Sequence, residues 1–415
     1  MKRAVLCLLF AVLLFHPLVS RAEAETCVAV ASDLHYLAPS LTDGGSYYQR
    51  VLANGDSKFM PYIEEITDAF LEEMLALKPD ALLLTGDLTF NGAVISHEAL
   101  AAKLRILTAA GIPVFVLTGN HDLYNANAAR FQGDGFSHVP FATTEIFEQI
   151  YEEFGRREAL SADPDSLSYV VQLSDSVRVL MLDFNTLHNW CGLPENSFGW
   201  IERQLQSARE SGMEVLAAGH QNLFQHSIFR DGYVIDGAQR LSELLRNYGV
   251  RIFLSGHLHI QHVQTEDGLT EIAGSALCSY PCQYGLLKVE DRGLQYETRQ
   301  LDMAAWAERN KREEEIFSDF QTAAAEYMRD HFRASPPPVE ALTPTTAGVD
   351  LRERLLSFLQ TLNLAYFSGD LRTAAALDPD QSLATIWLNN ADPLTAGYIA
   401  SIIKEYGQDF TKWTQ

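Results

Sequence analysis

Five short apolar runs in this 415-residue chain each lead, through a small residue, into a side chain that can bind a metal ion. The run 112–117 is the clearest, since consecutive amide, imidazole and carboxylate side chains follow it at 120–122. Apolar runs of this length, bounded by turn residues, predict short buried strands. We therefore expect five strand ends to converge on one edge of a sheet. The polar residues at these ends are Asp33, His35, Asp87, Asn120, His121, Asp122, His220, His257 and His259.

Helical patterns separate these runs, because apolar residues recur there at spacings of three and four. The patterns predict helices over 61–77, 96–110, 144–154, 200–211 and 239–248. Further strands are expected at 168–173, 178–182, 270–273 and 286–290. This alternation favours an α/β domain over residues 25–302, with both parallel and antiparallel strand connections.

The character of the chain changes at about residue 303. Helical patterns cover 304–332, 350–369, 381–389 and 393–406, and a proline-rich linker lies near 334–346. We find no polar cluster with metal-binding or catalytic spacing in this part of the sequence. A single hydrophobic core rarely grows beyond about 250–300 residues. We therefore interpret residues 303–415 as a helical accessory region that packs on the first domain or presents a surface to a partner.

The first 24 residues have the pattern of a secretory signal peptide. Lys2 and Arg3 begin it, an apolar segment follows at 5–14, and Ala22-Glu23-Ala24 is a small-x-small cleavage site. A retained membrane anchor is the alternative, but the apolar segment is shorter than the roughly 20 residues that a membrane span needs. We expect an exported protein, whether secreted, periplasmic or on the cell surface, with no transmembrane span after processing.

The formal charge of the chain is −23, and removal of residues 1–24 takes away three basic residues and one acidic residue, which makes it −25. A surface this acidic repels the backbone of nucleic acids at long range. The sequence therefore argues against a nucleic acid polymer as partner, although bound metal ions could still create a local positive site.

Four cysteines remain after processing: Cys27, Cys191, Cys278 and Cys282. An even number allows disulfides in an exported chain, and three pairings are open. We favour Cys191 with Cys278 or Cys282. The spacing is not that of a zinc ribbon, so we assign the cysteines no metal-binding role.

Carboxylates and imidazoles without thiolates are typical ligands of Mn, Fe or Zn. Two such ions about 3.5–4 Å apart are a recurrent device for phosphate ester hydrolysis, because one pair stabilises both the attacking and the leaving oxygen. His257 and His259 lie two residues apart in an extended segment, so both face the same side. The polar set is therefore suited to a dinuclear centre.

The order Asp-x-His, Gly-Asp, Gly-Asn-His-Asp, Gly-His and Gly-His-x-His resembles the calcineurin-like metallophosphoesterase superfamily over about residues 27–300. The resemblance implies two mixed β-sheets packed face to face with helices outside, and two divalent transition metal ions. It implies that the first metal is held by Asp33, His35 and His259, the second by Asn120, His220 and His257, and that Asp87 bridges both.

The resemblance also implies a hydroxide between the metals as the nucleophile. His121, outside the metal shell, would stabilise the phosphorane oxygens or protonate the leaving group, and Asp122 would orient its ring. A cap on the following turn is the alternative role for Asp122. Purple acid phosphatases of this superfamily carry a tyrosine where this chain has Phe90. The motifs Gly-Asn-His-Asp and Gly-His-x-His are more similar to those of the phosphodiesterase branch than to those of the protein phosphatases.

The prediction is an exported, dinuclear metal-dependent phosphoesterase that hydrolyses the diester bond of a small substrate such as a cyclic nucleotide. Alternatives are a phosphomonoesterase that scavenges phosphate and a binding protein that retains a metal site for stability. Candidate substrate contacts, for which structural roles are the alternative, are Asn91, His188, Asn189, Tyr36, Tyr124, Trp190 and Tyr280.

Overall fold

The computed structural model describes residues 25–187, 189–290, 293–334 and 349–415. The predicted signal peptide lies outside the described residues, as do most of the proline-rich linker near 334–346 and His188. The predicted boundary between a domain at 25–302 and an accessory region at 303–415 stays a prediction.

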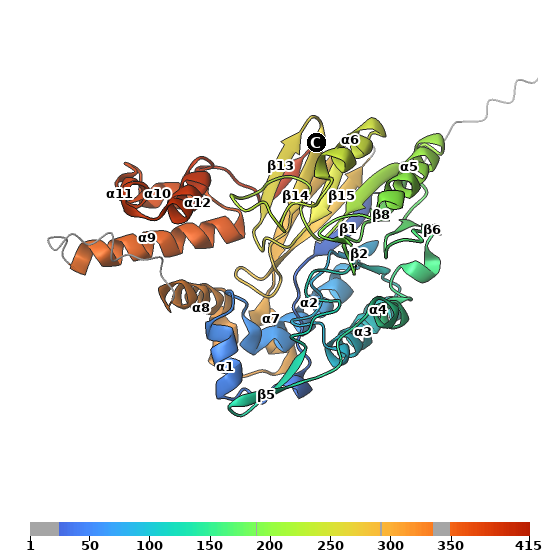
Figure 1. Ribbon diagram of the computed structural model, residues 1–415. Coiled ribbons are helices and arrows are strands. Elements are labelled where there is room, and N and C mark those ends of the chain that lie inside the picture. Colours follow the sequence, from blue (N-terminus) through green and yellow to red (C-terminus); the bar gives the residue numbers. More distant parts are fainter. Residues whose placement is uncertain (1–24, 188, 291–292, 335–348) are drawn as a thin grey trace, which may run out of the picture.

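Two mixed β-sheets form the centre of the molecule (Figure 1). The six-stranded sheet has the order β17 (Lys412–Thr414), β16 (Gly293–Gln300), β15 (Gln283–Glu290), β1 (Thr26–Ala31), β2 (Ala81–Leu84) and β3 (Val114–Val116). The seven-stranded sheet has the order β13 (His262–Glu266), β14 (Leu269–Ala273), β12 (Ile252–Ser255), β11 (Glu214–Ala218), β8 (Val177–Met181), β7 (Tyr169–Gln172) and β6 (Ser161–Ala162).

In each sheet the strands that matter for the site run parallel. β1 pairs with β2 and β2 with β3 in parallel register, and β11 pairs in parallel with both β8 and β12. The outer strands pair antiparallel, for example β15 with β16. Parallel neighbours end at the same edge of a sheet, so the loops that follow these strands lie together.

The sheets pack face to face through side chains that alternate along each strand. In β1, Val28 and Val30 belong to the core between the sheets, whereas Ala29 and Ala31 face the helices outside. Leu216 and Ile252 meet the same inner core from the other sheet. The predicted fold class, two mixed sheets packed face to face and flanked by helices, is confirmed.

Helices cover both outer faces of the sandwich (Figure 1). The face of the six-stranded sheet carries α2 (Ile63–Leu77), α3 (Val94–Ala109), α4 (Thr144–Tyr151) and α7 (Met303–Asn310). The other outer face carries α5 (Glu195–Glu210) and α6 (Ala238–Asn247). The five helices predicted before residue 250 are all present, although α5 begins earlier than expected, directly after Pro194.

The expected long helix over 304–332 is wrong as one element. α7 ends at Asn310 because Lys311 adopts a left-handed backbone, with φ of 55°. A short 3-10 turn at Glu315–Asp319 follows, and α8 (Phe320–Ala334) begins after it. The apolar pattern continues across this break because both helices bury their faces in the same core.

The C-terminal helices form a separate layer beside the sheets, on the side away from α4 and α5 (Figure 1). They are α9 (Val349–Ser368), α10 (Arg372–Leu377), α11 (Ser382–Asn390) and α12 (Pro393–Ile403). Trp387 is buried in a cluster of their own apolar side chains. The chain then returns to the six-stranded sheet as β17, which the sequence did not predict, since three residues carry no readable periodicity.

All four described cysteines are free thiols, so the predicted pairing of Cys191 with Cys278 or Cys282 is wrong. Cys191 lies in the apolar core outside the seven-stranded sheet, and Cys278 and Cys282 lie in the core outside the six-stranded sheet. The sandwich itself separates them. Within the described ranges, no helix has the length and apolar character needed to cross a membrane.

Candidate metal centre

Five strands end at one edge of the sandwich, each two to four residues before a predicted ligand. The pairs are β1 with Asp33, β2 with Asp87, β3 with Asn120, β11 with His220 and β12 with His257. His35 and His259 follow Asp33 and His257 by two residues. We call the seven side chains together the metal edge. Their roles as ligands stay predictions, but the structure brings all seven together, as the distances below show.

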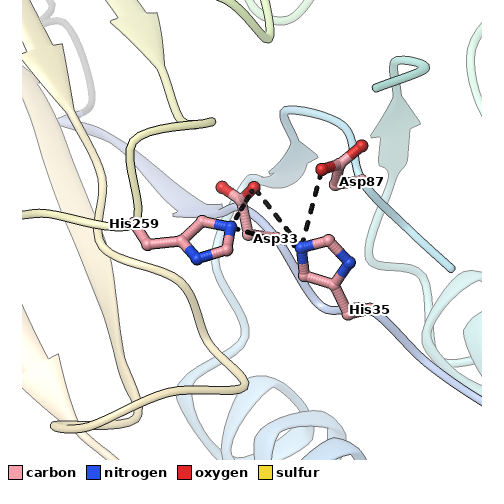
Figure 2. Close-up of side chains that lie close together, drawn as sticks. All are labelled: Asp33, His35, Asp87 and His259. Carbon is pink, nitrogen blue, oxygen red and sulfur yellow. Dashed lines mark hydrogen bonds and ion pairs between the residues drawn. The ribbon is translucent and has the colours of Figure 1, made fainter. Parts of the chain in front are cut away.

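The first group at the metal edge contains Asp33, His35, Asp87 and His259 (Figure 2). Asp33 Oδ1 lies 3.2 Å from His259 Nε2 and 3.8 Å from His35 Nε2. The two imidazole nitrogens are 3.3 Å apart, and His35 Nε2 is 3.5 Å from Asp87 Oδ2. Four potential ligand atoms thus surround one point.

The second group shares Asp87 with the first and adds His220 and His257. His220 Nε2 lies 3.4 Å from the same Oδ2 atom of Asp87 and 3.2 Å from the side-chain oxygen of Asn120. The rings of His220 and His257 are 5.0 Å apart between centroids. Asp87 therefore lies between two ligand sets, as a bridging carboxylate must.

Backbone hydrogen bonds fix which ring nitrogen faces the centre. His220 Nδ1 lies 2.9 Å from the carbonyl oxygen of Thr85, and His257 Nε2 lies 3.0 Å from that of Gly232. In a neutral imidazole, a ring nitrogen that donates to a carbonyl leaves the other nitrogen unprotonated and free to bind a metal. His220 would bind through Nε2 and His257 through Nδ1.

Five of the seven side chains sit on left-handed backbone: Asp33 (φ 54°), His35 (46°), Asp87 (47°), His257 (69°) and His259 (61°). Such conformations cost about 1–3 kcal/mol each for residues other than glycine and persist only where the surroundings enforce them. Glycines make the close approach possible: a Cβ on Gly119 would lie 2.1 Å from Asp87 Oδ1, and one on Gly256 would lie 1.8 Å from Ser32 Oγ.

The chemistry of the site fits divalent metal ions. Asp33 Oδ1 is buried and, among the described residues, has no hydrogen-bond donor. Burial lowers the pKa of the His220 ring, yet Asp87 and Asp33 outweigh it and raise that pKa to about 9. The site therefore attracts positive charge, and its converging acceptor atoms supply the imidazole and carboxylate ligands that transition metals prefer.

His121 lies at the open side of the metal edge. Its backbone N–H donates to Asp87 Oδ1 at 2.8 Å, and its Nε2 lies 3.9 Å from Asp87 Oδ2. Nδ1 is 2.8 Å from the carbonyl oxygen of Phe90, which orients the ring. One third of the side chain is exposed, so Nε2 can meet a substrate.

The predicted role of Asp122 in orienting His121 is wrong. Asp122 is fully buried, and its carboxylate holds the backbone of the neighbouring loops. It accepts hydrogen bonds, at 2.8–3.0 Å, from the backbone N–H groups of Gly119, Leu88 and Thr89 and from the Thr89 hydroxyl. Asp122 thus connects the loop of Asp87 to the loop of His121. This arrangement is closer to the alternative role of a structural cap, and the buried carboxylate cannot touch a substrate.

Two cavities flank His121. The first, about 480 Å³, is lined by Lys58, by asparagines and by four aromatic rings, those of Tyr47, Phe90, Phe131 and Phe136. We call it the aromatic cavity. The second, about 430 Å³, is the asparagine cavity, which Asn120, Asn185 and Trp190 line. His121, Asn125 and Asn127 line both cavities.

The predicted substrate contacts divide between the cavities and the core. Asn91 lines the aromatic cavity, and Tyr124 and Trp190 line the asparagine cavity. Tyr36 is instead buried and donates to Glu64, and Tyr280 packs against the core outside the six-stranded sheet. His188 lies outside the described residues. Lys58, Tyr47, Phe131 and Phe136 could not be identified from the sequence, because none of them follows one of the five predicted strand ends.

Comparison with known proteins places this geometry in a family context. A family model described as calcineurin-like phosphoesterase matches residues 28–261. A probable cyclic nucleotide phosphodiesterase of Rhodococcus erythropolis is 25% identical over 209 residues, which are 48% of this chain and 58% of that protein. A probable glycerophosphodiester phosphodiesterase GpdQ of Arcobacter nitrofigilis is 25% identical over 187 residues, 44% of this chain and 57% of its own length.

The match thus spans somewhat more than half of each of these curated relatives. Among solved structures, a dimetal phosphatase from Danio rerio aligns with a TM-score of 0.47 and 14% identity, over 66% of this chain and 96% of that protein.

Proposed function

This chain belongs to the calcineurin-like phosphoesterase family, and on that premise we propose that it is an exported, dinuclear metal-dependent phosphodiesterase acting on a small substrate. One observation carries the proposal. A single oxygen, Asp87 Oδ2, lies 3.5 Å from His35 Nε2 in one ligand group and 3.4 Å from His220 Nε2 in the other. A site that shares one carboxylate in this way suits two metals better than one.

The first metal would be held by Asp33, His35 and His259, and the second by Asn120, His220 and His257, with Asp87 common to both. When bound, such a pair of Mn, Fe or Zn ions polarises the phosphate and lowers the pKa of water to give a nucleophile near neutral pH. The other contributions come from the chain. The left-handed ligand backbone and the carbonyl partners of His220 and His257 orient the ligands before a metal arrives.

His121 would donate a proton to the leaving group. Its Nδ1 is held by the Phe90 carbonyl, so Nε2 is the atom that gives or takes a proton. Because His121 lines both cavities, it could serve a leaving group bound in either of them.

The two cavities favour a diester over a monoester. A phosphodiester carries two organic groups on one phosphorus, whereas a monoester carries one. The aromatic cavity and the asparagine cavity meet at His121 and have similar volumes, about 480 and 430 Å³, so each can accept one organic group. Ligand sites in proteins commonly have about 300–1,000 Å³.

The test is the hydrolysis of bis-p-nitrophenyl phosphate against p-nitrophenyl phosphate by the protein without residues 1–24. The protein is first stripped of metal and then restored with Mn, Fe or Zn separately. We expect metal-dependent turnover with a preference for the diester. A preference for the monoester would move the proposal to a phosphate-scavenging phosphatase. No turnover with any metal would favour a binding protein with a retained metal site.

Export rests on the sequence pattern of residues 1–24. Expression of the full-length chain with a C-terminal tag, followed by cell fractionation and N-terminal sequencing, tests it. We expect the tagged protein outside the cytoplasm with a new N-terminus close to Glu25. A tagged cytoplasmic protein that still begins at Met1 would overturn this part of the proposal.

A further inference from the structure

A single basic side chain, Lys58, lines the aromatic cavity beside His121. In the described part of the chain, no other lysine or arginine reaches the wall of either cavity next to His121. Lys58 belongs to the loop between α1 (Ser46–Ala53) and the 3-10 turn at Met60–Tyr62, and its backbone pairs with Ser279. Only 5% of the residue is exposed, which is unusual for lysine and calls for a partner.

Asp56 holds the ammonium group of Lys58 in place. Its Oδ2 accepts a hydrogen bond from Lys58 Nζ and lies 3.8 Å from Nδ1 of the predicted ligand His259. Burial lowers the pKa of Lys58, but Asp56 outweighs this effect and keeps that pKa above its usual value, so the side chain is charged. The loop therefore places a fixed positive charge next to the metal edge.

An ammonium group has three N–H donors. Among the described residues, Asp56 is the only hydrogen-bond partner of Lys58 Nζ. The remaining donors belong to a charged group in the wall of a cavity that also presents His121. An anionic oxygen bound in that cavity would find these donors without any change in the fold.

We propose that Lys58 binds an anionic oxygen of the substrate phosphate, held in position by Asp56. The inference rests on the proposed function, and it identifies Lys58 as a further substrate-binding residue of that site. The chain needs such a group because its overall charge is −23 and three carboxylates, those of Asp33, Asp56 and Asp87, lie around the site. A cation among them reduces the repulsion of an anionic substrate.

The test uses Lys58→Met, which removes the charge but keeps a long side chain, and Lys58→Arg, which restores the charge. Lys103→Met is the matched control, because Lys103 pairs with Glu64 and Asp68 on the helical face and lines neither cavity. Inorganic phosphate binding to each metal-loaded protein is measured by calorimetry, and KM and kcat are measured with bis-p-nitrophenyl phosphate. Metal content is determined for every variant.

We expect Lys58→Met to weaken phosphate binding and to raise KM by about 10- to 100-fold, the range of a hydrogen bond to a charged group, with metal content unchanged. Lys58→Arg should recover most of the loss, and Lys103→Met should match the parent chain. Unchanged phosphate affinity and KM in Lys58→Met would overturn the inference.

Asp56 contacts both Lys58 and the predicted ligand His259, so Asp56→Asn tests both contacts, whereas Lys58→Met tests only one. Half of the Asp56 side chain is exposed, so Lys58→Met leaves a carboxylate that water can solvate. We expect Asp56→Asn to weaken metal retention at His259 as well as phosphate binding, whereas Lys58→Met affects phosphate alone. A loss of metal from Lys58→Met as large as that from Asp56→Asn would overturn the direct role of Lys58.

The same measurements test the proposed function separately from the role of Lys58. If the parent chain hydrolyses no ester but its phosphate affinity depends on Lys58, the proposed function fails and the anion site stands. If the parent hydrolyses the diester and Lys58→Met does so with the same KM and phosphate affinity, the function stands and the role of Lys58 fails.

Discussion

Two clusters in this molecule combine histidines with carboxylates but differ in their backbone conformation. One is the metal edge. The other, which we call the tail junction, consists of His226, Glu271, His262 and Glu405 and joins the seven-stranded sheet to the C-terminal helices. In the tail junction the two His Nδ1 atoms lie 2.8 Å apart, His226 Nε2 lies 3.1 Å from Glu271, and His262 Nε2 lies 3.1 Å from Glu405.

Most polar groups of the tail junction have hydrogen-bond partners within it or in the backbone, although His226 Nε2, 3.1 Å from Glu271, makes no hydrogen bond among the described residues. Glu271 also accepts hydrogen bonds from the backbone N–H groups of Leu223 and Phe224 and from the hydroxyl of Ser255. None of its four residues has left-handed backbone. At the metal edge, by contrast, five of the seven side chains sit on left-handed backbone. The backbone conformation, rather than the residue type, distinguishes the two clusters.

The largest effect expected from this comparison is that of Asp87→Asn. The change removes the negative charge shared by both ligand groups, so we expect both metals to be lost and metal-dependent turnover to disappear. Metal content by mass spectrometry and diester hydrolysis measure the two effects. Glu405→Gln at the tail junction is the matched control and should retain both. Full metal occupancy in Asp87→Asn would remove the basis for a bridging role.

His121→Asn should lower kcat by about 100- to 10,000-fold, the usual contribution of a positioned acid or base. Metal content should stay at the parent level, because His121 Nε2 lies outside the two ligand groups. The loss should shrink for a diester whose leaving group needs no proton, such as p-nitrophenolate. An equal loss for good and poor leaving groups would argue for a structural role of the ring.

The grouping of the seven metal-edge side chains could be predicted from sequence because each of them has a local signal, whereas their roles as metal ligands stay predictions. Asp33 and His257 each follow a short apolar run and a small residue, so strand and side chain are read from one stretch. Lys58 has no such signal, since its position depends on pairing with Ser279, more than 200 residues away. The resemblance implies that Asp122 orients His121, whereas only the folded loops show that its carboxylate accepts hydrogen bonds from Thr89.

The tail junction escaped prediction for the same reason. No local pattern links His226 to Glu271 or His262 to Glu405, because these partners lie 45 and 143 positions away in the sequence. The predicted disulfide is wrong because pairing depends on which face of a sheet each cysteine occupies. The number of cysteines carries no such information.

His97 extends the comparison to a buried histidine without a carboxylate hydrogen bond. Its Nε2 lies 3.1 Å from the backbone oxygen of Asp122, its Nδ1 lies 3.1 Å from the Tyr151 hydroxyl, and burial lowers its pKa to about 4. In the unfolded chain the pKa of histidine is about 6.5. Between these values the unfolded chain binds more protons, so stability is complete above pH 6.5 and is lost as the pH falls towards 4.

We expect this histidine to account for up to about 3 kcal/mol of the free energy of unfolding lost between pH 6.5 and 4. His97→Gln, which never ionises, should lose less stability over that range. Urea unfolding of both proteins at several pH values measures the difference. Parallel pH profiles for the two proteins would show that the ring is protonated, or absent from the core, in the folded state.

The smallest expected effect is the loss of folding stability in Glu405→Gln at the tail junction. The Glu405 side chain is one third exposed, and a glutamine oxygen can still accept from His262 Nε2, so only a partly screened charge is lost. We expect the free energy of unfolding to fall by less than about 1 kcal/mol, the usual scale for exposed ion pairs, with metal content and turnover unchanged.

This small change discriminates between two views of the C-terminal helices. If the tail junction is a structural contact, activity is insensitive to it. If the helices control the metal edge, weakening the contact should alter KM or kcat. His262 begins β13, three residues after the predicted ligand His259, and Gln261 donates to the Phe410 carbonyl oxygen. The C-terminal part of the chain is therefore in direct contact with the segment that follows His259. A several-fold change in KM with stability preserved would make the C-terminal helices part of the active site rather than a support for it.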